Sequence, residues 1–154
     1  MIRYVLAVLL TVAIIGISMP AIEQAAVDRS QKQVETAVAD IEVAATSLIE
    51  EETLPPAGVR GPQRVVEAPF PTKGYFTAPV QRIEIELGPD AEASVVRYWV
   101  QGGPRRTAMI DAPIVNVNGN EVKLGLSTGT QRFVLTLERS ESLDQPVVVL
   151  SRPQ

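Results

Sequence analysis

The chain has 154 residues, with 18 acidic and 14 basic side chains, a net charge of −4, and neither Cys nor His. This composition excludes a disulfide framework and thiolate or imidazole metal sites. It also argues against nucleic-acid binding, which needs a basic face, and we expect no cofactor. An acid excess with only Lys32, Lys73 and Lys123 as lysines is typical of a halophilic protein, the alternative being an ordinary acidic protein from a GC-rich genome.

The first expected element is a membrane-spanning helix. Residues 4–22 carry no charge, and as a helix they span about 28 Å, close to the hydrocarbon thickness of a bilayer. A signal peptide is the rival interpretation, but its best cleavage site, Gly16-Ile17-Ser18, lies inside the apolar run. We therefore predict an anchor over residues 1–22 that contacts membrane lipid through residues 4–22. Arg3 favours a cytoplasmic N-terminus, which would make this a single-pass cell-membrane protein with its remaining residues outside.

An amphipathic helical stalk is expected over residues 23–52. Pro20 predicts either a kink in one continuous helix or, with Ser18 as the cap, the start of a second helix. The stalk carries a narrow apolar stripe of coiled-coil type, repeating every seven residues at Val27, Val34, Ile41 and Leu48. This stripe could pack on the protein's own β domain or contact a partner helix, including a second copy. In the latter case we expect Val27 and Val34 to lie beyond the reach of the β domain.

A Pro/Gly linker over residues 53–61 precedes an antiparallel β domain over residues 62–154, giving an α+β fold. Alternating polar and apolar residues predict eight short strands, arranged as a sandwich or a strongly curved sheet. The expected strands are 64–68, 80–87, 94–100, 107–110, 114–117, 121–126, 132–138 and 147–151. Asn118-Gly119 is a strong signal for a hairpin between the fifth and sixth of them.

Several short patterns resemble catalytic or binding motifs, but each has a structural explanation. Gly125–Gly129 matches the G-x-S-x-G nucleophile pattern, yet Ser127 has no histidine to take its proton, which leaves only Lys123 as a base. Paired carboxylates at Glu84 and Glu86 fit the solvent face of an alternating strand. The Gly-Gly turn before Arg105 and Arg106 could bind an anion or simply end a hairpin, and Trp99 is expected in the core. We expect no enzyme and no catalytic or metal site.

Five segments together resemble a family of uncharacterised haloarchaeal membrane proteins with no assigned activity. They are Met1–Leu10, Ser18–Ile22, Gln33–Val38, Gly61–Val66 and Ile110–Val115. The order of apolar helix, amphipathic stalk and β domain is similar to type IV pilins and pseudopilins. The chain departs from their processing motif, because Arg3 rather than Gly or Ala precedes the apolar run. The resemblance implies a structural or assembly subunit of an archaeal surface or secretion apparatus. The alternative is a stand-alone anchored module that binds or senses a ligand outside the cytoplasm.

Overall fold

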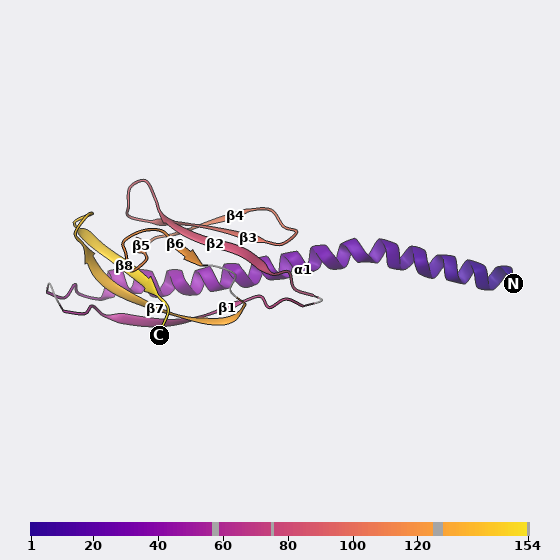
Figure 1. Cartoon of the computed structure of the whole chain (residues 1–154), viewed down its shortest axis with the longest axis horizontal. Coiled ribbons are helices and arrows are strands. Elements are labelled where there is room, and N and C mark those ends of the chain that lie inside the picture. The colour runs from indigo at the N-terminus through magenta and orange to yellow at the C-terminus, as the bar shows by residue number, and fades with distance from the viewer. Residues whose placement is uncertain (57–58, 75, 125–127, 154) are drawn as a thin grey trace.

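The computed structural model describes residues 1–56, 59–74, 76–124 and 128–153. One helix, α1 (Ile2–Glu51), runs without interruption through Pro20. Its residues 2–25 are exposed, and the rest lies against the β domain (Figure 1). Ser18 does not cap a second helix, since its hydroxyl donates to the Ile14 carbonyl at 2.7 Å. The continuous alternative is therefore correct, and the helix axis bends gently in its exposed half (Figure 1).

In the part of the chain that the structure describes, eight strands follow the helix and form two four-stranded sheets, as the alternating pattern predicted. Sheet one has the order β1-β7-β8-β5, and sheet two has the order β4-β3-β2-β6. The strand bounds are β1 (Gln63–Phe70), β2 (Val80–Leu87), β3 (Ser94–Val100), β4 (Arg106–Ile110), β5 (Ile114–Val115), β6 (Val122–Leu124), β7 (Gly129–Ser140) and β8 (Gln145–Ser151). The fold is α+β, and its sheets are mostly antiparallel.

The predicted hairpin at Asn118-Gly119 is wrong in its pairing, although the turn itself forms. Gly119 adopts a left-handed φ of 75° and donates its N–H to the Asn116 carbonyl at 2.9 Å. The strands on either side of the turn separate. β5 pairs in parallel with β8 in sheet one, whereas β6 pairs with β2 in sheet two. The turn therefore carries the chain from one sheet to the other.

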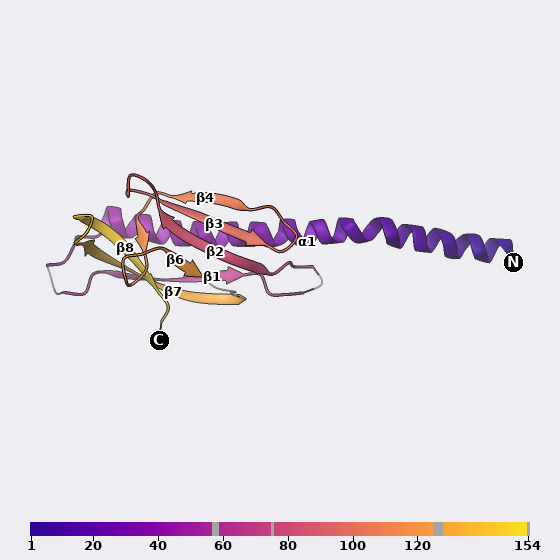
Figure 2. The same cartoon turned by 45° about the horizontal axis from the view of Figure 1, so that its top comes forward.

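The C-terminal half of α1 fills the space between the two sheets (Figures 1 and 2). Helix, sheet one and sheet two contribute to a single hydrophobic cluster, which includes Leu48, Phe133 and Ile85. Phe70 and Phe133 meet edge to face with their ring centroids 6.2 Å apart. Away from the helix, β2 of one sheet approaches β5 of the other. The helix and both sheets therefore share one hydrophobic core.

Candidate functional site

The predicted apolar stripe of the stalk is buried inside the protein itself. Val27, Val34, Ile41 and Leu48 are between 0% and 5% exposed, and Val34, Ile41 and Leu48 belong to the shared core. The stripe thus packs on the chain's own sheets, which is one of the two alternatives the sequence left open. In this structure it offers no surface to a partner helix.

The expectation that Val27 and Val34 lie beyond the β domain is wrong. The turn between β3 and β4 reaches past Val34 to the level of Val27. A Cβ atom placed on Gly103 in that turn would lie only 2.7 Å from Val27 Cγ1. A larger residue at this position would force the Val27 or Gln31 side chain to shift. The β domain therefore packs against the stalk from residue 26 onward.

Polar contacts fix the N-terminal half of the stalk to the β domain. Ser30 Oγ accepts a 2.8 Å hydrogen bond from the Ala78 amide. Gln31 Oε1 accepts from Arg106 at 3.3 Å. The sequence analysis did not single out Ser30 and Gln31, although both are buried. Their three- and four-residue spacing from Val27 and Val34 was the available signal, because it places them on the same helix face.

Tyr98 makes a third polar contact with the helix. Its hydroxyl donates to Glu35 Oε1 at 3.2 Å, and its ring is buried in the core. Burial raises the pKa of Tyr98 to about 12, and the neighbouring Glu35 carboxylate adds to the rise while Arg106 opposes it. The phenol therefore stays protonated and keeps its role as a donor at physiological pH.

Trp99 faces outward, so its assignment to the core is wrong. Alternation along β3 turns Tyr98 inward and leaves Trp99 half-buried on the outer face of sheet two. The Arg105 guanidinium lies over the Trp99 ring, 4.5 Å from its centroid. Arg106 is directed to Gln31 instead. The two arginines after the Gly-Gly turn thus serve an aromatic stack and a helix contact, and they do not converge on one anion.

The carboxylate pair predicted for the solvent face of β2 lies within ion pairs. Glu84 pairs with Arg82 at 3.2 Å, and Glu86 pairs with Arg97. Among the described residues no group of three or more His, Cys, Asp or Glu side chains could hold a metal ion. These carboxylates are therefore parts of a charged outer surface on sheet two.

The serine motif falls partly outside the described residues, which do not include Ser127. Lys123, its possible base, is exposed and paired with Glu121. The hydrogen bond and the charge of Glu121 raise the pKa of Lys123. A lysine that acts as a general base needs a lowered pKa, so the surroundings of Lys123 act in the opposite direction.

Residues 2–25 of α1, the exposed segment, form an apolar stretch of helix that does not pack on the β domain. It is long and apolar enough to cross a membrane, and none of its most apolar 18-residue window is buried in the protein. This segment could contact membrane lipid and is consistent with a single-pass anchor. It is continuous with the stalk, so no flexible linker separates it from the β domain.

Comparison with known proteins identifies one family, whose model matches residues 1–153. The chain belongs to the family DUF7311, a domain of unknown function. The match covers the helix and both sheets, so the family unit includes the exposed segment as well as the β domain. No curated protein matches the chain, and no solved structure does.

Proposed function

We propose that this DUF7311 protein is a non-catalytic, membrane-anchored structural subunit that assembles through the exposed segment of α1. The observation that carries the proposal is the single continuous helix. Its first half is apolar and unburied, and its second half is part of the core of the β domain. A pilin-like subunit needs this coupling, because forces on the anchor must reach the outer domain without a flexible joint. A tethered binding module does not need it.

The finer features of the proposal follow from charge and chain order. Arg3 precedes the apolar run, which favours a cytoplasmic N-terminus and a β domain outside the cell membrane. The acid excess and scarce lysine favour a halophilic, archaeal source, and with it a surface or secretion apparatus as the assembly. The surface offered to neighbours is the exposed segment, since the stalk stripe is already occupied.

Cysteine crosslinking in native membranes tests assembly, and the cysteine-free chain provides a clean background. Ile14→Cys places a thiol on the exposed apolar segment, and single cysteines at its neighbours map the face that contacts another subunit. We expect oxidation to yield crosslinked species at positions spaced three or four residues apart. Val43→Cys is the matched control, because Val43 is exposed on the stalk. A lack of crosslinks throughout the segment, with a monomer in mild detergent, would reject assembly.

A stand-alone binding module is the second candidate, and one surface feature favours it. A groove of about 840 Å³ runs along β6 and the end of β8, lined by Asn116, Lys123 and Leu150 among others. The groove is open, and its lining is both polar and apolar, with amide, ammonium and aliphatic groups within reach of one ligand. Lys123→Ala would weaken ligand binding there without changing crosslinking of the helix, and this difference separates the two candidates.

A further inference from the structure

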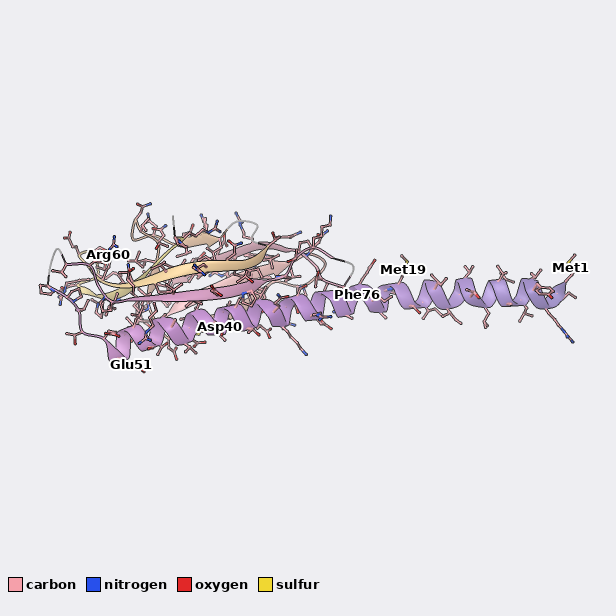
Figure 3. The ribbon with its side chains drawn as sticks, turned by 90° about the horizontal axis from the view of Figure 1, so that it is seen from below. Met1, Met19, Asp40, Glu51, Arg60 and Phe76 are labelled. Atoms are coloured by element: carbon pink, nitrogen blue, oxygen red, sulfur yellow. The ribbon has the colours of Figure 1, made fainter. Side chains whose placement is uncertain are left out.

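Phe76 is an aromatic side chain with no place in the core. It lies between β1 and β2, where the structure describes residues 71–74 and 76–79, and it is 66% exposed. The loop runs along α1 toward the exposed segment (Figure 1). Figure 3 shows Phe76 beside the helix, between Met19 and Asp40. Burial on this chain does not explain a large apolar group there.

The level of Phe76 along the helix coincides with the end of the expected membrane span. Phe76 lines a hollow of about 470 Å³ together with Ser18, Ile22 and Arg29 of α1. The uncharged run that could cross the bilayer ends at Ile22. If residues 4–22 fill the hydrocarbon layer, Phe76 lies within about two helical turns of its boundary, at the depth where aromatic side chains collect in membrane proteins.

The hollow beneath Phe76 has the chemistry of a lipid site. The helix side chains that line it are mainly apolar, Ala21, Ile22, Ala25 and Ala26. The hydroxyl of Ser18 is already bonded to the Ile14 carbonyl. Arg29 lies at the outer end of the hollow along the helix and, among the described residues, is not ion-paired. An apolar hollow with one unpaired cation on its outer side matches an acyl chain below a phosphate group.

We propose that the described parts of the loop between β1 and β2, residues 71–74 and 76–79, rest on the membrane surface. Phe76 inserts into the interfacial layer, the upper methylenes of a phospholipid acyl chain occupy the hollow, and Arg29 faces the headgroup phosphate. This inference rests on the proposed membrane anchoring and adds a second contact to it. The β domain is then held on the bilayer at two places, by the helix and by the loop.

Tryptophan quenching in liposomes of the full-length protein tests the contact. Phe76→Trp is introduced together with Trp99→Phe, so that the probe is the only tryptophan. The probe is compared in phosphatidylcholine brominated near the headgroup and near the chain end. We expect about twofold stronger quenching by the shallow bromines, as for an interfacial aromatic residue. Val59→Trp in the same background is the control, because Val59 is exposed beside Arg60 at the far end of the molecule (Figure 3).

Two further comparisons test whether a phospholipid or a second copy of the chain occupies the hollow beneath Phe76. Quenching at position 76 should not depend on protein density, and Arg29→Gln should reduce it whereas Arg60→Gln should not. Quenching no greater than at Val59→Trp would overturn the inference. So would quenching that disappears at high density, which would mean that a second copy fills the hollow. Equal quenching in Arg29→Gln would overturn the phosphate contact. A carbonate wash of the same liposomes separates these outcomes from failure of the anchor, because an unanchored protein would be released.

Discussion

Removing the stalk should unfold the β domain, although every strand lies after the stalk in the chain. A fragment that starts at Pro62 retains both sheets and loses the helix between them. Each branched aliphatic side chain is worth about 1.5–3 kcal/mol when buried, so the five from the helix contribute roughly 8–15 kcal/mol. That sum is comparable with the whole stability of a typical domain, about 5–15 kcal/mol. The five are Val27, Val34, Val38, Ile41 and Leu48.

Circular dichroism and thermal melting of two truncated chains provide the assay. A chain starting at Gln24 lacks most of the exposed segment and keeps the core, so it should be soluble and melt cooperatively. The fragment from Pro62 should show no cooperative transition. In the longer chain, Ile41→Asp and Val34→Asp should each destabilise by at least 2–5 kcal/mol, about the size of lost core packing. Val43→Asp, at an exposed helix position, should change little. A cooperative melt of the Pro62 fragment would refute the reasoning.

Four further predictions concern single sites and salt. Gly61→Ala should disrupt the start of β1, because the new Cβ would lie 1.7 Å from the Leu137 carbonyl oxygen; a melting temperature within a few degrees of wild type would contradict this. Tyr98 has a raised pKa of about 12, so its stabilising contribution is complete below pH 10 and is lost as the pH rises toward 12; Tyr98→Phe should flatten alkaline melting curves in that window. The chain from Gln24 should melt higher in molar KCl than in dilute buffer, because salt screens carboxylate repulsion; equal stability would remove the basis for a halophilic source. Ser127→Ala should leave fold and phenotype unchanged, and loss of a hydrolase activity with intact stability would overturn the non-catalytic assignment.

The periodicity of the sequence was sufficient to locate the elements. The strand predicted over residues 80–87 matches β2, and that over 94–100 matches β3. This agreement has a physical basis, because each strand has one face in the core and alternates accordingly. The same holds for α1, whose stripe repeats every seven residues. A stripe identifies the face that is buried, but it does not identify the surface that buries it.

The errors of prediction arise where local patterns depend on distant partners. Asn118-Gly119 forms its turn locally, but β5 pairs with β8, which lies more than thirty residues away in the chain. Core use of Trp99 was taken as the default, although Arg97 shares its strand face and indicated an outward direction. The proposed contact of Phe76 with the membrane could not be read from the sequence, because it depends on where Phe76 lies along the helix.

The continuous helix also sets a rotational phase between the exposed segment and the β domain. An α-helix turns about 100° and rises about 1.5 Å for each residue. One residue inserted between Ile22 and Ala26 would therefore swing the β domain by more than a quarter turn around the helix axis. Four inserted residues would return it to within about 40° of its starting direction and move it outward by about 6 Å. In the proposed assembly, the number of residues between the apolar run and the first buried stalk position would therefore set which face of the β domain is turned toward a neighbouring subunit.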